Sequence, residues 1–572
     1  MNTNTHKGFN GLVLLVVFVL LITGCAKFEN REFLVDKPQS ILDQEALDAL
    51  GELKSYVTYS NQPSFTLGAE ISLNDIRNNS LLYRLVQKQF DQLGLGSVLS
   101  HLNSVQADGS IVLTDLESAL AANDTTGTDA YVGHLVWHQN QRSAYLNSLI
   151  ADIVLPGKSG SDVVVDFESN NLGDTYPTTT SNVKAYVIND PDGKSGKVLR
   201  VVRTTGTAYP QFQITLPEGR QLKHYTTVQV DFKGGTCCGY YGFGMQMAIS
   251  SSLGNVGTVG YASPSSFGFP ADVWGRGLIT LSLANLNLPE SLKEANTFVL
   301  TLGSGTGSAD YLLDNITMNW NIPGETIVKT PEEKAAIIRG ELDKWLKAVA
   351  EAANGGASSW SVVYQPMDDN NPSEIRTGVG TTVPANTFYW QDYLGKDYAA
   401  IAINLFRQYY GNNVKLFITE TNLIGNTAKI QGLKDFITYT ESKGAQVDGI
   451  ATELALDLNT NKSQVEAMLS ALAGTGKLIK ISALDIGVGV TVSLANNDLY
   501  ESQAEMYKWF VDAYYRLIPP AQRAGIIFKS PMDRATSSNW RPGEPVGLWT
   551  TQYLRKKAYA GVVEALEANK GK

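Results

Sequence analysis

The sequence contains few residues of the types that build metal centres and disulfide frameworks. It has 3 cysteines and 5 histidines among 572 residues. No cysteine is spaced with a histidine as zinc binding or an activated thiol nucleophile would require. Cys237 and Cys238 are adjacent, so their Cα atoms would lie about 3.8 Å apart, closer than the roughly 4.4 Å of ordinary disulfides. Two free thiols are therefore favoured over a strained disulfide between these neighbours.

Basic residues are also scarce. The 46 lysines and arginines are outnumbered by 56 acidic residues, which gives a formal net charge of -10. No stretch forms the basic stripe that a nucleic-acid-binding surface requires, and this argues against nucleic acid as a partner. A neutral polymer such as a polysaccharide fits the charge better, although mild acidity also serves solubility alone.

Long apolar runs are absent except near the N-terminus. Leu12–Ile22 is too short to span a bilayer but has the length of a signal-peptide core. It runs into ITGC at residues 22–25, which resembles a bacterial lipobox. We therefore predict a lipoprotein signal peptide over residues 1–24, lipidation of Cys25 and a polar tether over residues 25–60. An ordinary secretory signal followed by an incidental cysteine is the alternative.

The lipid anchor, if formed, determines the expected location. Several acyl chains on one cysteine hold a protein stably on a membrane, which a single chain does not. We therefore expect a protein anchored to the outer membrane by lipid and exposed at the cell surface.

Residues 155–324 differ in character from the sequence on either side. They are rich in Gly, Ser and Thr, and their short β-type runs are separated by turn signals, which is typical of an all-β sandwich. The predicted strands are Val163–Val165, Val198–Val202, Gln211–Leu216, Thr227–Phe232, Met245–Ile249, Leu278–Leu283 and Thr297–Leu302.

The flanking sequence has helical patterns. Thr330, Pro331 and Glu333 form an N-cap, a first-turn proline and a capping-box glutamate. The helix that they predict has apolar residues at helical spacing, namely Ile337, Ile338, Leu342, Trp345, Leu346 and Val349.

Several motifs in the flanks resemble glycoside hydrolase family 10, the retaining xylanases. They are WSVVYQPMDD (Trp360–Asp369), FYWQDYLGKDY (Phe388–Tyr398), KLFITETNL (Lys415–Leu423) and SNWR (Ser538–Arg541). The resemblance implies an α/β fold, a (β/α)8 TIM barrel built from residues 61–154 and 325–572. Its first strand would be Phe65–Glu70 and its third Gly133–His138, and the segment 155–324 would be inserted between the third and fourth strands.

The positions that carry the chemistry of this family are substituted. Retaining glycoside hydrolysis needs one carboxylic acid that protonates the leaving oxygen and a second carboxylate that attacks the sugar. By resemblance the acid/base position is Gln365, and the nucleophile position in the ISALDI strand is Ala483. The histidine that supports the nucleophile is replaced by Ala455. An amide cannot supply the proton and a methyl group cannot attack, so we predict no catalytic residue and a pseudoenzyme.

The inserted segment resembles carbohydrate-binding modules of the jelly-roll type, through VVVDFESNNLGD at residues 163–174 and YLLDNITMNW at residues 311–320. Such modules stack aromatic rings on sugar faces and bind sugar hydroxyls with polar side chains. The aromatic candidates here are Trp274, Tyr240, Tyr241, Tyr261 and Phe269, and the polar candidate is Arg276. Trp274 lies among Gly and Pro, so we predict a loop there and a stacking platform. Related modules hold a structural calcium ion, for which the resemblance suggests Asp166, Glu168 and Asp314; no other cofactor is implied.

Three hypotheses of function follow. The first is a surface glycan-binding protein that captures xylan or a decorated xylan for neighbouring hydrolases and outer-membrane import proteins. A residual cleft of the barrel would then be lined by Trp137, His138, Tyr364, Gln365 and Trp540. The second is an endo-acting xylanase-like hydrolase with an acid/base pair rebuilt from among Glu420, Glu453, Asp368 and Asp369. The third is a scaffold that binds another protein and no glycan.

Overall fold

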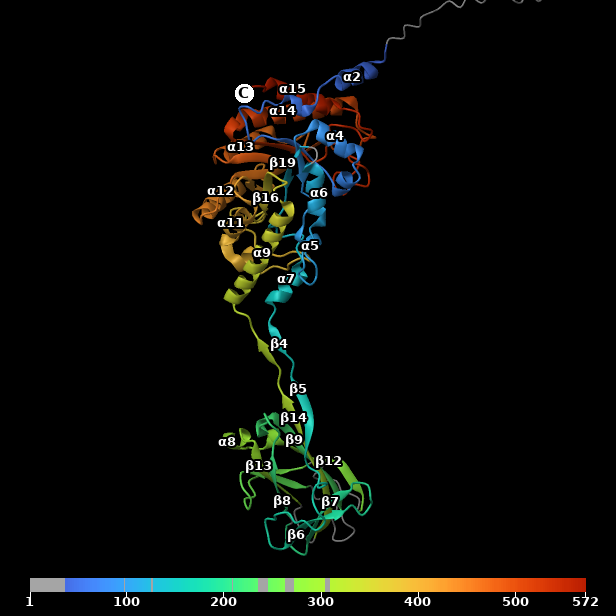
Figure 1. Ribbon diagram of the computed structural model, residues 1–572, viewed down its shortest axis with the longest axis vertical. Helices are drawn as coiled ribbons and strands as arrows, with labels where there is room; N and C mark the ends of the chain where they lie inside the picture. The colour runs from blue at the N-terminus through green and yellow to red at the C-terminus, as the bar shows by residue number, and fades with distance from the viewer. Residues whose placement is uncertain are drawn as a thin grey trace, which may run out of the picture. The chain divides into compact units, whose positions relative to one another are not determined.

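The computed structural model describes residues 37–96, 98–124, 127–207, 209–234, 245–262, 272–303 and 309–572. The chain forms two compact units, of which unit 1 comprises Met1–Ile150 with Thr330–Lys572 and unit 2 comprises Ala151–Lys329 (Figure 1). No helix in the described part is both long and apolar enough to cross a membrane. The predicted signal peptide and Cys25 lie outside the described residues.

Unit 1 is a closed barrel of eight parallel strands in the order β1-β2-β3-β16-β17-β18-β19-β20. The strands are β1 (Leu67–Glu70), β2 (Gln92–Leu95), β3 (Asp129–Val132), β16 (Ser359–Tyr364), β17 (Lys415–Glu420), β18 (Gly449–Asp457), β19 (Leu478–Gly487) and β20 (Arg523–Phe528). The last strand pairs in parallel with the first, which closes the sheet. The predicted (β/α)8 barrel is confirmed.

Helices surround this barrel (Figure 1). They are α3 (Leu73–Arg77), α4 (Leu81–Gln89), α5 (His101–Ser104), α6 (Thr114–Asp124), α7 (Ser143–Ile150), α9 (Pro331–Ala353), α10 (Gln391–Leu394), α11 (Tyr398–Tyr410), α12 (Thr427–Ser442), α13 (Lys462–Ala473), α14 (Asn497–Leu517) and α15 (Lys557–Ala568). Short 3-10 turns lie at η1 (Leu53–Tyr56), η4 (Gly395–Asp397) and η5 (Pro520–Gln522). The apolar faces of the helices and the outward faces of the strands form one large core.

Helix α9 follows the sequence signals closely. The Thr330 hydroxyl accepts a hydrogen bond from the backbone N–H of Glu333, and the Glu333 carboxylate accepts one from the backbone N–H of Thr330. This reciprocal pair satisfies two donors at the helix start that have no partner within the helix. The predicted apolar face is buried, with Ile337 only partly covered.

Two barrel strands differ from their predicted positions. The first begins at Leu67, two residues late, and the third ends at Val132, before the predicted segment Gly133–His138. Leu135 and Val136 donate backbone hydrogen bonds to carbonyls of β16, the strand on one side. The prediction for the third strand was wrong because residues 133–138 follow β16 alone, without β2 as a second neighbour.

The predicted tether over residues 25–60 also needs correction. Helix α2 (Gln39–Asp48) is exposed, as a tether would be, but Leu53 is fully buried in the barrel core. Its backbone N–H donates to the Gln89 side chain, 3.1 Å away, and the Tyr559 hydroxyl donates to the Gly51 carbonyl. The barrel therefore begins before residue 61, because the apolar side chain of Leu53 gains more from burial than from staying in a polar linker.

Unit 2 contains two antiparallel sheets and a short ribbon. A six-stranded sheet has the order β12-β9-β14-β7-β6, with β5 paired to β14, and a four-stranded sheet has the order β11-β10-β13-β8. The strands are β4 (Ile153–Leu155), β5 (Lys158–Val165), β6 (Val183–Asn189), β7 (Lys197–Arg203), β8 (Gln211–Thr215), β9 (Tyr225–Gly234), β10 (Gln246–Ser250), β11 (Thr258–Tyr261), β12 (Trp274–Ser282), β13 (Thr297–Gly303), β14 (Ala309–Ile322) and β15 (Glu325–Ile327). Two 3-10 turns, η2 (Leu222–His224) and η3 (Leu283–Asn285), and the short helix α8 (Glu290–Lys293) connect some of them. Each predicted strand of this segment overlaps an observed one, although Leu216, Met245 and Leu283 fall just outside the observed strands.

The two sheets of unit 2 enclose a hydrophobic core of their own. Its buried members lie between Phe167 and Met318 and include no residue of the barrel. The β4–β15 ribbon places Ile153 opposite Ile327, so the two points where the chain enters and leaves the unit are adjacent. The predicted limits of the insert, 155 and 324, missed this ribbon by a few residues at each end.

A separate core predicts separate folding. We expect residues 151–329, expressed alone, to unfold in one cooperative transition on heating, since all partners of the unit 2 core are retained. The transition would be followed by circular dichroism, in the near ultraviolet for fixed tertiary packing and in the far ultraviolet for strand content. Loss of fixed tertiary signal with strand content retained would show instead that this core needs the barrel.

Candidate functional site

A pocket of about 450 Å³ opens at the carboxyl ends of the barrel strands, the end where barrels of this architecture carry their sites. Its lining residues come from β16 to β20 and the segments that follow them. They are Tyr364, Gln365, Thr421, Asn422, Leu423, Ile424, Glu453, Leu454, Ala455, Ala483, Lys529 and Trp540. We call it the cleft pocket. Three of the five predicted cleft residues line it: Tyr364, Gln365 and Trp540.

Gln365, at the expected acid/base position, has both ends of its amide engaged. Its Oε1 accepts a hydrogen bond from the indole N–H of Trp137 at 3.1 Å, and its Nε2 donates to the Thr421 hydroxyl at 2.9 Å. Gln365 has a φ of 52°, a left-handed backbone conformation uncommon for a residue other than glycine. The side chain is thus a neutral, fixed wall of the pocket with no acidic proton.

Tyr364 fills the space beside this amide. Its hydroxyl donates to Glu453 Oε1 at 2.9 Å, and its ring centroid lies 3.6 Å from that of His134 and 5.1 Å from that of Trp137. Burial, followed by the charge of Glu453, raises the pKa of Tyr364 above its usual range. The phenol therefore stays neutral and serves as a hydrogen-bond donor to the carboxylate.

Ala483, at the expected nucleophile position, presents only a methyl group to the pocket. It pairs in register with Glu453 across β18 and β19. Lys529 Nζ lies 3.8 Å from Glu453 Oε2 and 4.5 Å from the centre of the Trp540 ring. The floor of the pocket thus combines one carboxylate, one ammonium group and one indole, with no carboxylate on β19 at position 483.

Asp485, two residues further along β19, is buried rather than available. Its Oδ2 accepts hydrogen bonds from the Trp540 indole at 2.6 Å and the Ser530 hydroxyl at 2.7 Å. Burial raises the pKa of this carboxyl. Asp485 therefore orients Trp540, whose ring lines the pocket.

Three of the four carboxylates suggested for a rebuilt acid/base pair do not line the cleft pocket, and each is held by its own partners. Glu420 is fully buried, accepts hydrogen bonds from the backbone N–H groups of Met367 and Thr421 at 2.8 Å each, and pairs with Lys429 at 3.0 Å. Burial is the main reason that the pKa of Glu420 is raised. A carboxylate without access to the pocket cannot reach a substrate.

The two aspartates after β16 are engaged in the same way. Although burial acts in the opposite direction, hydrogen bonds from Lys429 and Arg376 hold the pKa of Asp369 below its usual range. Asp368 accepts backbone hydrogen bonds from residues 370 and 371 through one oxygen. Of the four candidates only Glu453 lines the cleft pocket.

Glu70, which the sequence reasoning missed, does not line the cleft pocket but is influenced by charges that do. It ends β1, is half-buried, and feels the charges of Lys529 and Glu453. Burial raises the pKa of Glu70 to about 7, so its carboxyl group holds a proton in a large fraction of molecules near neutral pH. Its position at the end of the FTLGAE strand was the signal that could have found it.

The remaining two predicted cleft residues lie beside the pocket. Trp137 lines a smaller hollow of about 220 Å³ together with His134. His138 is buried and stacks on Tyr389, with ring centroids 5.5 Å apart and planes 13° apart. Burial, followed by the charge of Arg376, lowers the pKa of His138 to about 4. A neutral, stacked His138 supports the wall of the site and lines neither hollow.

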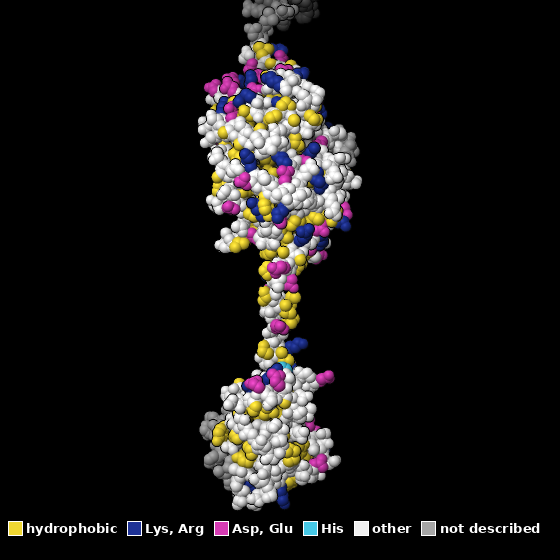
Figure 2. Space-filling model, turned by 90° about the vertical axis from the view of Figure 1, so that its left-hand side faces the viewer, with side chains coloured by type: hydrophobic (Ala, Val, Ile, Leu, Met, Phe, Trp, Pro, Cys, Tyr) yellow, Lys and Arg dark blue, Asp and Glu magenta, His cyan; other side chains and the backbone are white. Residues whose placement is uncertain are grey.

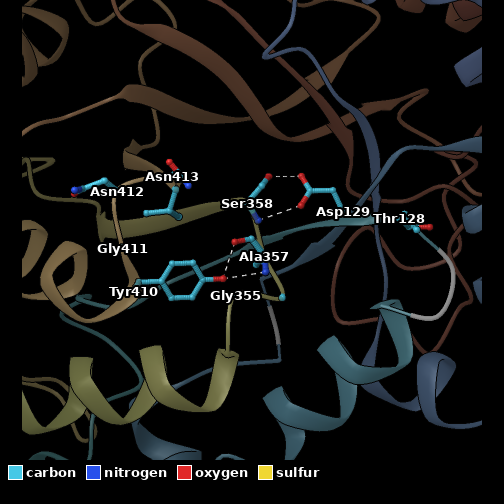
Figure 3. A pocket seen from close by; sticks show the side chains of 12 residues that line it. Thr128, Asp129, Gly355, Ala357, Ser358, Tyr410, Gly411, Asn412 and Asn413 are labelled. Carbon is cyan, nitrogen blue, oxygen red and sulfur yellow. Dashed lines mark hydrogen bonds between the residues drawn. The ribbon is translucent and has the colours of Figure 1, made fainter.

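A second large pocket lies at the opposite, amino end of strands β3, β16 and β17 (Figure 3). Its volume of about 500 Å³ is similar to that of the cleft pocket. The Tyr410 hydroxyl bonds to both backbone groups of Ala357, and Ser358 bonds to Asp129. These polar groups satisfy one another, so chemistry favours the cleft pocket over this one.

In unit 2 the structure changes the role predicted for Trp274. It is not in a loop: it opens β12 and pairs with Lys233 of β9. Its indole N–H donates to Asp190 at 3.4 Å, and the Arg276 guanidinium lies 4.9 Å from its ring centre. The loop prediction was wrong because this cross-strand pairing outweighs the turn tendency of the flanking Gly and Pro. One ring face is covered by Arg276, and the ring remains partly exposed.

Arg276 and Tyr261 contrast in their environments. Arg276 pairs with Asp231 at 2.9 Å and lies 3.7 Å from Asp314. Tyr261 ends β11 with 67% of its surface exposed, which suits an aromatic platform. The other predicted contacts, Tyr240, Tyr241 and Phe269, and the thiols of Cys237 and Cys238 lie outside the described residues.

The three acids predicted to bind calcium, all within the described residues, do not lie together as a ligand group. In the described part of the chain, no three acidic, histidine or cysteine side chains gather as metal ligands. Asp166 accepts the backbone N–H of Glu168, Glu168 accepts that of Lys197 at 3.0 Å, and Asp314 is buried beside Arg276 and Asn315. Each of the three carboxylates has a different local partner, and the calcium site stays a prediction.

Comparison with known proteins supports the barrel assignment. Residues 317–565 match the family model for glycosyl hydrolase family 10. An endo-1,4-beta-xylanase A of Thermoanaerobacterium saccharolyticum is 26% identical over 212 residues, which cover 36% of this chain and 16% of the relative. The endo-beta-1,4-xylanase Xyn10C of Cellvibrio japonicus is 25% identical over 281 residues, covering 45% of this chain and 43% of the relative. The chain thus spans less than half the length of either relative.

Solved structures show the same fold. A GH10 structure from Paenibacillus barcinonensis superposes with a TM-score of 0.51 at 12% identity, covering 90% of this chain and 97% of that one. Xylanase B from Clostridium stercorarium F9 gives a TM-score of 0.50 at 13% identity, covering 90% of this chain and all of the other. The chain therefore contains a (β/α)8 barrel that is similar to those of glycosyl hydrolase family 10, together with an antiparallel β-sheet unit.

Proposed function

We propose that this protein binds xylan-type polysaccharide without hydrolysing it. The observation that carries the proposal is the fixed Gln365 amide, bonded at both ends to Trp137 and Thr421, with the Ala483 methyl at the other catalytic position. Neither group can protonate a glycosidic oxygen or attack a sugar carbon. The xylan direction rests on the relatives, which are xylanases by name.

Binding is assigned in this proposal to unit 2. Exposed aromatic rings lose little conformational freedom on binding and provide flat apolar area for sugar faces. Tyr261 is the most exposed of the described candidates, and the partly exposed Trp274 is flanked by the polar groups of Asp190 and Arg276. On the face drawn in Figure 2, basic and acidic side chains are interspersed, with no broad area of one sign. That surface suits a polymer recognised by stacking and hydrogen bonds.

The proposal extends to location. Cys25 at the end of the ITGC motif would carry the lipid anchor, placing the protein on the outer membrane and at the cell surface. Polysaccharide captured there would pass to neighbouring hydrolases and import proteins. Metabolic labelling with a fatty-acid probe, lost in Cys25→Ala, tests the anchor.

A second candidate function is hydrolysis by a rebuilt pair, and Glu70 is the observation that favours it. A carboxyl group with a pKa near 7 is suited to act as a general acid, as in glycosidases that place a carboxyl group in an apolar site. Glu453 would be the second carboxylate. Against this role, Glu453 is held by the Tyr364 hydroxyl and faces Lys529.

Hydrolysis is the first point to test. We expect the purified full-length protein to release no reducing sugar from xylan, because no free acid and nucleophile face each other at the family positions. Reducing-end assays and chromatography of the products would measure this. Release that persists in Gln365→Ala but disappears in both Glu70→Gln and Glu453→Gln would establish the second candidate instead.

Restoring the two lost carboxyl groups should not restore activity. In Gln365→Glu/Ala483→Glu the new acid would still lie beside Tyr364, which holds Glu453, and Ala455 would still lack the orienting histidine. Removing a member of a catalytic unit costs nearly as much as removing the whole unit. We expect xylan hydrolysis indistinguishable from that of the matched Gln365→Gly/Ala483→Gly protein. Xylanase-like turnover in the repaired variant would mean that the rest of the site is intact.

Substituting two tryptophans of unit 2, one at a time, tests where the glycan binds. Removing an aromatic anchor costs about 2 kcal/mol, roughly a thirtyfold loss of affinity. Trp274→Ala should therefore migrate clearly faster than the unmodified protein in affinity electrophoresis through gels that contain xylan. Trp320 is the matched control: it also lies under an arginine, Arg220 at 3.4 Å, and its indole N–H also donates to an aspartate, Asp162.

Trp320→Ala should leave binding near the level of the unmodified protein. Both variants would be compared by thermal unfolding so that a folding defect is recognised. If Trp274→Ala binds normally while Trp540→Ala does not, the cleft pocket and not unit 2 holds the glycan.

A further inference from the structure

Arg203, at the end of β7, is buried without any partner. Side chains alternate along a strand, so Arg203 lies on the same face as Leu199 and Val201, which belong to the core between the two sheets. Only 3% of its surface is exposed. Its Nε, Nη1 and Nη2 atoms are all buried with no hydrogen-bond partner, which is true of no other arginine in the described part of the chain.

An isolated buried guanidinium is costly, because it loses the water that solvated its charge and gains nothing in exchange. Native proteins pair such groups or use them. No carboxylate of the described residues lies within ion-pair distance of Arg203, whereas Arg200 on the same strand pairs with Asp310 at 2.6 Å. No described residue therefore neutralises the charge of Arg203.

The segments of unit 2 outside the described residues contain no acidic side chain. Residue 208 and the segments 235–244, 263–271 and 304–308 contain no aspartate and no glutamate. They contain five aromatic residues instead: Tyr240, Tyr241, Phe243, Phe267 and Phe269. A carboxylate of a bound molecule could supply the pairing that the described residues do not give Arg203.

Polar and aromatic groups surround this position. Burial raises the pKa of the Tyr209 phenol; the nearby Tyr261 hydroxyl adds to this, and the charge of Arg203 opposes it. The Tyr209 hydroxyl donates a hydrogen bond to the Gln246 side chain. Gly206 is exposed and close to the guanidinium: a Cβ built on it would lie 3.4 Å from Arg203 Nη1. A small group entering beside Gly206 would meet a cation, a phenol and an amide.

Strand registers place these groups at one end of unit 2. Arg203 pairs with Ala309 at the start of β14, and Gln246 at the start of β10 pairs with Tyr261 at the end of β11. The chain enters and leaves the unit beyond the other end of β14, where Ile322 pairs with Lys158. The Arg203 end is therefore free of the chain connections to unit 1.

We propose that Arg203 receives the carboxylate of a uronic acid side group on the bound polysaccharide; this rests on the proposed glycan-binding function and adds its ligand class. A guanidinium binds a carboxylate through two parallel N–H···O bonds. A pendant sugar can enter beside Gly206 while the main chain lies across Tyr261. Because the whole protein carries a net charge of -10, attraction to an acidic polymer requires such a local cation.

The test compares one polymer in two states with the full-length protein. Glucuronic-acid-bearing xylan is compared with the same xylan after its carboxyl groups have been reduced to alcohols. We expect the acidic form to bind about tenfold more tightly or better, the usual effect of a charge-assisted hydrogen-bonded pair. Arg203→Met should bind both forms equally, at the weaker level, and Arg203→Lys should retain part of the difference.

Thermal unfolding separates a ligand-binding role from a structural one. Arg203→Met removes an unpaired buried charge, so its melting temperature without ligand should equal or exceed that of the unmodified protein. The matched control Arg200→Met loses a paired arginine of the same strand and should keep the preference for the acidic polymer.

Equal binding of the two polymers by the unmodified protein would overturn the proposal while leaving the glycan-binding function standing. A preference for the acidic polymer that survives in Arg203→Met would overturn the proposal as well. A lower melting temperature in that variant would then assign Arg203 a structural role. Failure of both polymers to bind would instead overturn the proposed function itself.

Discussion

The buried ion pair between Glu420 and Lys429 holds the wall of the cleft pocket together. Both side chains are fully buried and lie 3.0 Å apart. Lys429 also contacts Asp369 at 2.6 Å and the Thr421 carbonyl, and Glu420 receives the backbone N–H of Met367. Two charges are tolerated inside a protein only when their hydrogen-bonding capacity is filled. This pair therefore fixes the chain after β16 and β17, and with it the position of every group that lines the pocket from those strands.

Within that frame the side-chain polar groups of Gln365 and Tyr364 all have hydrogen-bond partners. An amide has one acceptor end and one donor end, and Gln365 matches them to the Trp137 indole and the Thr421 hydroxyl. Tyr364 then gives its proton to Glu453, the carboxylate that would otherwise face the pocket alone. The substituted site is thus a stable arrangement in its own right, built from neutral donors and acceptors in place of acids.

The two units answer the problem of buried polar groups differently. In the barrel, buried charges such as Lys556 and Asp533 pair at 2.7 Å. In unit 2, the charged groups near Trp274 are paired too, but Arg203 is not. A protein stabilised by its core can tolerate one unpaired group where a ligand supplies the missing partner. This contrast is the reason why we place ligand binding at the end of unit 2 that carries Arg203.

Local patterns in the sequence predicted the all-β unit and the start of α9, because periodicity and capping act over a few neighbouring residues. The barrel and the roles of positions 365 and 483 were implied by motifs that resemble a known family. The tertiary structure decided which polar groups meet. Trp274 was expected in a loop, yet it opens a strand and bonds to Asp190, which is 84 positions away in the chain. Glu420 could be read from sequence as a candidate acid, and only its burial against Lys429 removes it from the chemistry. Burial, charge pairing and the solvation of each ionisable group depend on residues from distant parts of the chain, and no local rule contains them.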